Sequence, residues 1–274
     1  MRLRIGYSLT YDLEQPTPMI VMLNAHYSRV SDLVSPDTMV TSPSTPYTSY
    51  RDSFGNWCNR VLAPAGRFQM RADAIVNDPG LPDEVPLDAW QSNVEDLPEE
   101  TLIYLLPSRY CESDRLVETA WQLFGTTPLG WERVQAISQW VHHHITFGYE
   151  WARPTKTAWD ALQEGRGVCR DFAHLGVALC RAMNLPARYC TGYLADIGVP
   201  PSAAPMDFAG WFEVFLGGRW YIVDPRNLVP RIGRVLIARG RDAADVAITT
   251  TFGPNQLQDF QVFADEVVDP TGTP

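Results

Sequence analysis

The chain has 274 residues, of which 45% are hydrophobic and 20% are charged, as is typical of a globular protein with a sizeable core. Its formal net charge is -10, which argues against nucleic-acid binding, because that function needs a basic face to neutralise phosphates. The N-terminal residues lack the apolar stretch of a secretory signal, and no apolar run approaches the length of a membrane span. The five cysteines contain no Cys-x-x-Cys pair and do not resemble a disulfide framework, so we expect a reducing, cytoplasmic location.

Short strands are predicted throughout the first 77 residues. Residues 3–13, 19–33, 50–62 and 67–77 are rich in the aliphatic and aromatic residues that favour strands. Pro64-Ala65-Gly66 predicts a turn between the last two of these segments, and residues 52–56 predict a turn between paired strands. The spacing of strands and turns indicates a β-rich, sandwich-like domain over residues 1–77.

A second domain follows a proline-rich segment. Four prolines and many acidic residues interrupt regular structure after residue 78, so residues 78–105 are predicted to be a linker. Helical patterns then begin at Ser113 and cover residues 129–145, 158–164 and 169–183. Strands are predicted at 187–194, 211–216 and 219–223, the last two as a hairpin. Helices followed by an antiparallel sheet indicate an α+β domain over residues 106–274, with a C-terminal extension.

The stretch Gly165-Arg166-Gly167-Val168-Cys169-Arg170-Asp171-Phe172 places a cysteine in the first turn of a predicted helix. The free N–H groups and the positive end of the helix dipole lie there, and both lower the pKa of a thiol. Cys169 is therefore a candidate nucleophile, although most free cysteines are simply buried. Asp171 is expected to cap the N–H groups of this turn.

Three further motifs follow in a fixed order: Arg188-Tyr189-Cys190-Thr191-Gly192-Tyr193-Leu194, Gly210-Trp211-Phe212-Glu213-Val214-Phe215 and Trp220-Tyr221-Ile222-Val223-Asp224-Pro225-Arg226-Asn227. Together with the Cys169 stretch they resemble the core of the bacterial transglutaminase-like family, and Asp52-Ser53-Phe54-Gly55-Asn56 resembles part of its amino-terminal domain. The resemblance implies a papain-like fold and thiol chemistry on the amides of a peptide or protein. It implies no metal and no organic cofactor.

The family's catalytic order of Cys, His and Asp is incomplete here. Cys169 matches the nucleophile and Asp224 matches the acid that orients the imidazole. The histidine belongs in a pattern resembling Asp-x-His-Ala-Trp, and the residue in its place is Ala209. Thiol catalysis needs a group that carries the proton, so this replacement removes the expected base.

Other residues are weaker candidates for the missing base or for other roles in the site. Asp207 is a candidate base, although an ordinary carboxyl pKa of about 3.9 is poorly matched to a thiol near 8.5. Arg170 is a candidate for stabilising a thiolate, and Trp211 is either a core residue or part of a substrate platform. His174 lies about 140° around the helix from Cys169, which favours a packing role. The cluster at residues 142–144 would need further ligands to bind a metal.

Three functions fit this sequence. The first is an amide hydrolase or acyl transferase that acts through a thioester on Cys169. The second is a catalytically inactive relative that binds a peptide or protein partner in the same groove. The third is a structural or assembly module that makes contacts through the N-terminal sandwich. Loss of a base normally costs such an enzyme several orders of magnitude in rate, but a cysteine depends less on an activator than other nucleophiles do.

Overall fold

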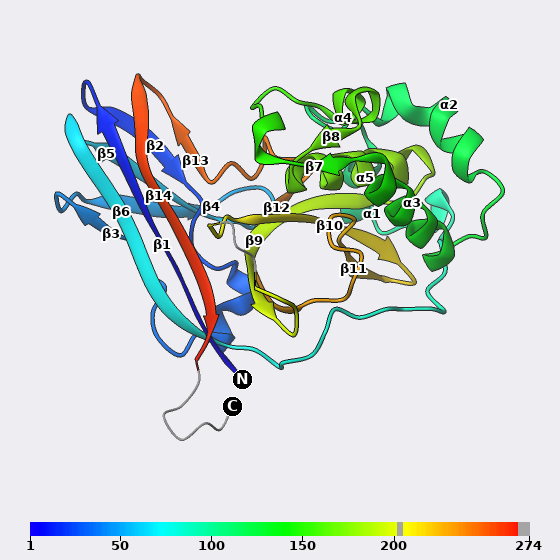
Figure 1. Cartoon of the computed structure of the whole chain (residues 1–274), viewed down its shortest axis with the longest axis horizontal. Coiled ribbons are helices and arrows are strands. Elements are labelled where there is room, and N and C mark those ends of the chain that lie inside the picture. Colours follow the sequence, from blue (N-terminus) through cyan, green and yellow to red (C-terminus); the bar gives the residue numbers. More distant parts are fainter. Residues whose placement is uncertain (202–204, 268–274) are drawn as a thin grey trace.

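The computed structural model describes residues 1–201 and 205–267 and shows an α+β fold (Figure 1). Antiparallel strands form one side of the molecule, and the longer helices pack together on the other side. A further antiparallel sheet lies between these two parts. The fold class expected from the sequence is therefore confirmed.

The β-rich side consists of two four-stranded antiparallel sheets. Its strands are β1 (Arg2–Leu13), β2 (Thr17–Val21), β3 (Val40–Ser42), β4 (Tyr47–Arg51), β5 (Trp57–Ala63), β6 (Gly66–Asn77), β13 (Thr249–Thr251) and β14 (Asn255–Glu266). One sheet has the order β14-β1-β6-β3 and the other has the order β13-β2-β5-β4. Along β1, side chains at alternating positions from Leu3 to Leu13 enter the core between the sheets, the period-two pattern of a strand with one buried face.

Two details of this side differ from the sequence expectation. Residues 19–33 are not one strand, because β2 ends at Val21 and a 3₁₀-helix follows at Tyr27–Asp32, capped by the His26 side chain. The predicted C-terminal extension of the core contributes β13 and β14 to the N-terminal sheets. β14 pairs with β1 from Leu3 opposite Glu266 to Leu13 opposite Asn255. Residues 268–274 of the predicted core domain lie outside the described residues.

The helical side contains α1 (Glu99–Leu102), α2 (Ser113–Phe124), α3 (Trp131–His144), α4 (Ala158–Glu164) and α5 (Cys169–Ala182). The middle sheet has the order β11-β10-β9-β12, with β9 (Ala187–Ile197), β10 (Ala209–Leu216), β11 (Arg219–Val223) and β12 (Ile232–Gly240). Two short parallel strands, β7 (Thr146–Phe147) and β8 (Arg166–Gly167), come together just before α5. Three further 3₁₀-helices lie at Val94–Asp96, Ile103–Leu105 and Tyr149–Trp151.

The middle sheet is buried on both faces. One face contributes Tyr193, Val235 and Ile237 to the core of the β-rich side. The other face contributes Phe212 and Val214 to the core of the helical side. The sheet therefore holds the two parts of the molecule together and fixes the position of α5 against β10.

Gly176 lets α5 approach β10 closely. A Cβ atom at this position would lie 2.5 Å from the ring of Phe212, which is fully buried. A larger side chain at position 176 would therefore push α5 away from the strand that faces it. In the described part of the chain, no helix is long and apolar enough to cross a membrane.

We expect Gly176→Ala to lower the free energy of unfolding by about 1–2 kcal/mol. Overpacking a core commonly costs about 1–3 kcal/mol, which exceeds the gain of up to about 1 kcal/mol that alanine brings to a helix interior. Urea unfolding measures the change. In a Phe212→Leu background, which removes the ring, the same substitution should be neutral or stabilising. A loss of equal size in both backgrounds would contradict the packing argument.

Candidate functional site

The N-terminus of α5 presents Cys169 in a turn fixed by two buried charges. The carboxylate of Asp171 accepts a hydrogen bond of 2.9 Å from the backbone N–H of Val168, as expected for a capping residue. The ammonium group of Lys156, which is fully buried, donates to the Arg166 carbonyl oxygen at 2.9 Å and pairs with Glu164. These contacts hold the chain that leads into the helix, and Cys169 remains half-buried while the other four cysteines are buried.

Strand β10 crosses directly over this helix end. A Cβ atom at Gly210 would lie 2.7 Å from the Tyr189 hydroxyl and 3.4 Å from the Arg170 backbone, so only glycine fits there without displacement. The backbone N–H groups of Gly210 and Arg170 both interact with the Cys169 sulfur. The neighbouring residue, Ala209, is half-buried and stands opposite Gly192 on β9.

Cys169 lies where two hollows meet. They have volumes of about 550 and 570 Å³, and Tyr149, Cys169, Asp207 and Phe208 line both. Ala209 lines the first hollow, so the cysteine and the residue in the expected histidine position face the same space. Together the hollows form a groove that extends on both sides of the thiol, and we call it the Cys169 groove.

The two halves of the groove differ in chemistry. The first hollow is lined by both charged and apolar residues, and the charged ones include Arg226, Arg231 and Glu266. The second is lined mainly by apolar side chains, among them Val246 and Ile248. β14 borders both hollows, through residues 264–266 on the first and Phe260 on the second, so the last described strand forms part of the groove wall.

Comparison with known proteins places this arrangement in a family. The family model of the transglutaminase-like superfamily matches residues 119–225. A crystal structure from Cytophaga hutchinsonii, described as a "putative cysteine protease", has a TM-score of 0.84 and 32% sequence identity, and the match covers 97% of this chain and 90% of that one. The chain belongs to the transglutaminase-like superfamily.

Two curated relatives extend the comparison. An uncharacterised protein of Mycobacterium leprae is 26% identical over 259 residues, which cover 90% of this chain and 91% of that protein. Kyphoscoliosis peptidase of the mouse is 32% identical over 100 residues, which cover 34% of this chain but only 15% of the peptidase. The likeness to the peptidase is therefore confined to about a third of this chain.

The thiol differs from the low-pKa nucleophile expected at a helix N-terminus. Burial and the nearby carboxylate of Asp207 raise the pKa of Cys169 to about 11, although the two backbone N–H groups act in the opposite direction. The expectation of a lowered pKa is therefore wrong, because desolvation and a like charge outweigh the helix end. Asp207 is an exposed residue, but partial desolvation of its carboxylate in the groove raises its pKa; the carboxylate accepts a hydrogen bond from the Phe208 N–H at 2.7 Å.

Asp224 is buried and already fully engaged by other groups. Arg234 donates to its Oδ2 at 2.5 Å, and Asn227 donates from its side chain to Oδ2 at 2.7 Å and from its backbone to Oδ1 at 3.1 Å. Burial alone would raise the pKa of Asp224, but Arg234 and Asn227 hold it below its ordinary value. The carboxylate is close enough to Cys169 to affect the thiol electrostatically, yet it lines a different cavity.

Arg170 and Trp211 contact neighbouring groups in the fold. The guanidinium group of Arg170 donates to the Arg153 carbonyl oxygen at 2.6 Å, and it lies 3.6 Å from Asp171. Trp211 is only 1% exposed and stacks near the guanidinium group of Arg234, with 5.1 Å between that group and the ring centre. Trp211 is therefore a core residue and does not offer a surface to a ligand.

The four histidines of the helical side form hydrogen bonds with backbone groups. His174 is buried, accepts a hydrogen bond from the Ala243 N–H at 3.1 Å and stacks on Tyr110, which agrees with the packing role expected for it. Burial lowers the pKa of His174, so it stays neutral. His142, His143 and His144 each bond to a backbone carbonyl oxygen. Within the ranges 1–201 and 205–267, no group of three or more metal-ligating side chains comes together.

Two contributors to the site could not be identified from sequence. Arg234 occurs in a strand among apolar residues, and only its isolated charge could have signalled a buried carboxylate partner. Tyr149 lies in a short 3₁₀-helix outside the recognised motifs. Its place in the groove is set by the tertiary fold, and no local sequence pattern indicates it.

We expect Asp207→Asn to lower the apparent pKa of Cys169, because the substitution removes the negative charge that opposes the thiolate. The rate of alkylation of Cys169 by iodoacetamide at pH 8–9, followed by mass spectrometry, should rise severalfold. Asp265→Asn is the matched control, since Asp265 is exposed in the same hollow and should leave the rate unchanged. Equal rates in the wild type and in Asp207→Asn would refute the electrostatic explanation.

We expect Asp224→Asn to lower the free energy of unfolding by about 2 kcal/mol at pH 7, because it removes one of the two carboxylates, Asp224 and Asp83, that pair with the buried cation of Arg234. The folded-state pKa of Asp224 is depressed, so its contribution is present above about pH 4 and is lost as the pH falls through the folded-state value. Urea unfolding at pH 7 and pH 3.5 should show the difference shrinking in acid. Asp73→Asn, in the exposed pair with Arg4, should change little at either pH.

Proposed function

We propose that this protein binds an extended peptide or protein segment in the Cys169 groove without turning it over at the rate of a cysteine protease. The observation that carries this proposal is Ala209, which faces the same hollow as Cys169 in the position where the family's histidine is expected. A methyl group cannot carry a proton, so the thiol has no imidazole to activate it.

The raised pKa of the Cys169 thiol supports a groove that binds a ligand without efficient catalysis. With a pKa of about 11, the Cys169 thiol is almost wholly protonated at pH 7. An imidazolium ion at position 209 would lower the pKa of the Cys169 thiol. The negative charges of Asp207 and Asp224 instead raise this pKa. The carboxylate of Asp224 is satisfied by Arg234 and Asn227, so the fold does not depend on a histidine partner for it.

The shape of the groove supports peptide binding. Two adjoining hollows of about 550 and 570 Å³ provide room for a chain that passes over the thiol. The charged half and the apolar half would accept different side chains on the two sides of Cys169. The similar structure from Cytophaga hutchinsonii is described as a "putative cysteine protease", which is consistent with a peptide as the ligand.

A slow thiol hydrolase or acyl transferase is the second candidate, and Asp207 is the observation that favours it. Asp207 lines both hollows together with Cys169, and its raised pKa brings it closer to that of the thiol. In this reaction Asp207 would take the thiol proton as the sulfur attacks an amide carbonyl, and would return it to the departing amine as the thioester forms. Each unit of mismatch between the two pKa values costs about 1.4 kcal/mol, which makes this route slow.

We expect the wild type to hydrolyse a library of fluorogenic peptides, and to transfer a glutamine-containing peptide to hydroxylamine, no faster than Cys169→Ser. Ala209→His should create activity that disappears when Cys169→Ser is added, because the imidazole can then take the thiol proton. Wild-type activity that depends on Cys169 and is lost in Asp207→Asn would instead establish the slow enzyme.

Binding is tested separately with phage-displayed nonapeptides. We expect selection on the wild type to enrich peptides that fail to bind Ala209→Trp, in which an indole fills the first hollow. Val117→Trp, at an exposed position on α2, is the matched control and should retain binding. If no peptide is enriched, or if Ala209→Trp binds the enriched peptides equally well, the groove is not a peptide site.

A further inference from the structure

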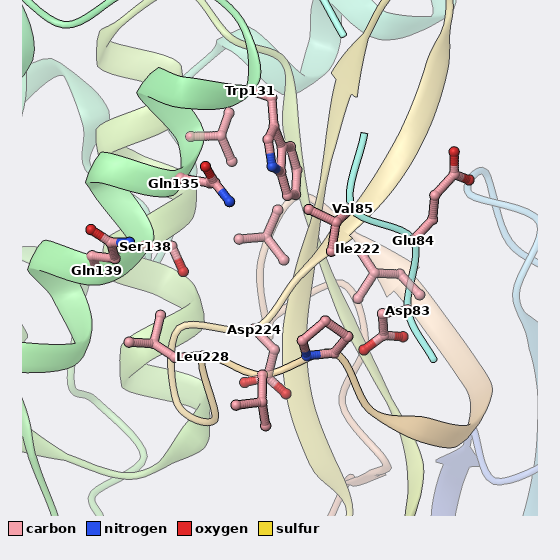
Figure 2. Close-up of a pocket in the computed structure, with 14 residues that line it drawn as sticks. Asp83, Glu84, Val85, Trp131, Gln135, Ser138, Gln139, Ile222, Asp224 and Leu228 are labelled. Atoms are coloured by element: carbon pink, nitrogen blue, oxygen red, sulfur yellow. The ribbon is translucent and has the colours of Figure 1, made fainter. Parts of the chain in front are cut away.

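Arg226 lies in the turn that follows β11, between the Cys169 groove and a smaller cavity of about 150 Å³. Asp224 and Leu228, at the two ends of this turn, line the smaller cavity (Figure 2), whereas Arg226 and Asn227 line the groove. The Leu228 N–H donates to the Asp224 carbonyl oxygen at 2.9 Å, and Asn227 bonds to the Asp224 carboxylate. These bonds close the turn and fix the backbone from which the Arg226 side chain extends.

The guanidinium group of Arg226 is held by an aromatic ring and by one hydrogen bond. Its central carbon lies 4.0 Å from the centre of the Phe147 ring, which lines the same hollow of the groove. Its Nη1 donates to Asn227 Oδ1 at 3.3 Å. Nε and Nη2 form no hydrogen bond with the described residues, and neither is among the polar atoms that are both buried and unbonded. These two donors are therefore accessible to a ligand in the groove.

Arg226 differs from the other arginines of the groove in its lack of an acidic partner. Each of the others pairs with a carboxylate: Arg231 with Asp196, Arg153 with Glu164 and Arg170 with Asp171. In the part of the chain that the structure describes, Arg226 forms no ion pair. An arginine is charged at every physiological pH, so this guanidinium group is suited to an anion supplied by a ligand.

The arrangement of the free donors indicates a carboxylate. Nε–H and Nη2–H lie along one edge of the planar guanidinium group, and their spacing matches the two oxygen atoms of a carboxylate. Asp207 and Glu266 also line this hollow. A phosphate group carries a charge of about -1.5 to -2 at pH 7, so these side chains repel it more strongly than they repel a carboxylate with a single charge.

We propose that the Cys169 groove selects peptides that carry a carboxylate, and that Arg226 is the residue that recognises this group. The inference rests on the peptide-binding function proposed above and adds the class of peptide. The carboxylate belongs to an acidic side chain or to the C-terminus of the peptide, since both present the same two oxygen atoms. It binds in the first hollow, and the part of the peptide on the other side of Cys169 meets the apolar side chains of Val246 and Ile248.

Affinity selection from two synthetic nonapeptide libraries tests the proposal. Both libraries are acetylated at the N-terminus, and one ends in a free carboxylate whereas the other ends in an amide. Peptides retained by the wild type are sequenced by mass spectrometry. Recognition of a side chain enriches aspartate or glutamate in the amide library, and recognition of the C-terminus retains peptides from the free-acid library alone. Either result supports the proposal, and the two together identify the source of the carboxylate.

Variants then show whether Arg226 is responsible. In a retained peptide, replacing the carboxylate by the isosteric amide should weaken binding to the wild type by about tenfold or more. With Arg226→Gln the same replacement should change the affinity by less than about twofold. Arg226→Glu should instead retain peptides enriched in lysine or arginine, a gain that a folding defect cannot imitate. Arg71→Gln, at an exposed position on β6, is the control and should keep the preference of the wild type.

Two results would overturn this inference and leave the peptide site intact. One is a set of retained peptides without an acidic group, and the other is a preference for the carboxylate that persists in Arg226→Gln. If neither library yields peptides that bind the wild type and fail to bind Ala209→Trp, the peptide site itself is refuted and this inference is refuted with it.

Discussion

The close contact between β10 and α5 is the constraint on which the rest of the site depends. Gly210 lets the strand lie against the backbone at the start of the helix, and Gly176 lets the ring of Phe212 press against the helix two turns later. With the strand fixed at both points, Ala209 and Cys169 open into the same hollow. The same strand brings the backbone N–H of Gly210 to the Cys169 sulfur, which lowers the pKa of the thiol, but desolvation and the charge of Asp207 outweigh this effect.

Arg234 is the electrostatic centre of the neighbouring region. Its guanidinium group is buried, pairs with both Asp83 and Asp224 and lies over Trp211. Asp83 comes from the segment that connects the two sides of the molecule, whereas Asp224 follows the strand next to β10. One fixed cation thus ties the connection to the site, and it gives Asp224 a structural role that does not require a histidine.

Local sequence patterns were sufficient to predict much of the helical side. α4 has the expected limits because Thr157 caps its start and Gly165, with φ of +59°, ends it. The capping role of Asp171 and the packing role of His174 also followed from their positions in one helix. Family resemblance, rather than local pattern, identified Ala209 as the position of interest.

Long-range properties could not be predicted in this way. The pairing of β14 with β1 joins segments at opposite ends of the chain, and nothing local in either strand specifies its partner. The pKa of Cys169 depends on burial and on Asp207, which approaches it only after folding, so the helix-end argument alone gave the wrong direction. The partnership of Arg234 with Asp224 likewise depends on how β12 is placed beside β9.

The position of β14 also determines when the groove can exist during synthesis. This strand lies beside β1 and borders both hollows around Cys169, yet it is the last of the described strands to be synthesised. A nascent chain that already contains Cys169 and Ala209 therefore lacks one wall of the groove. Pairing strands so distant in sequence is slow compared with forming local contacts. The groove as described therefore requires β14 to be synthesised and paired with β1, and a shorter nascent chain lacks it.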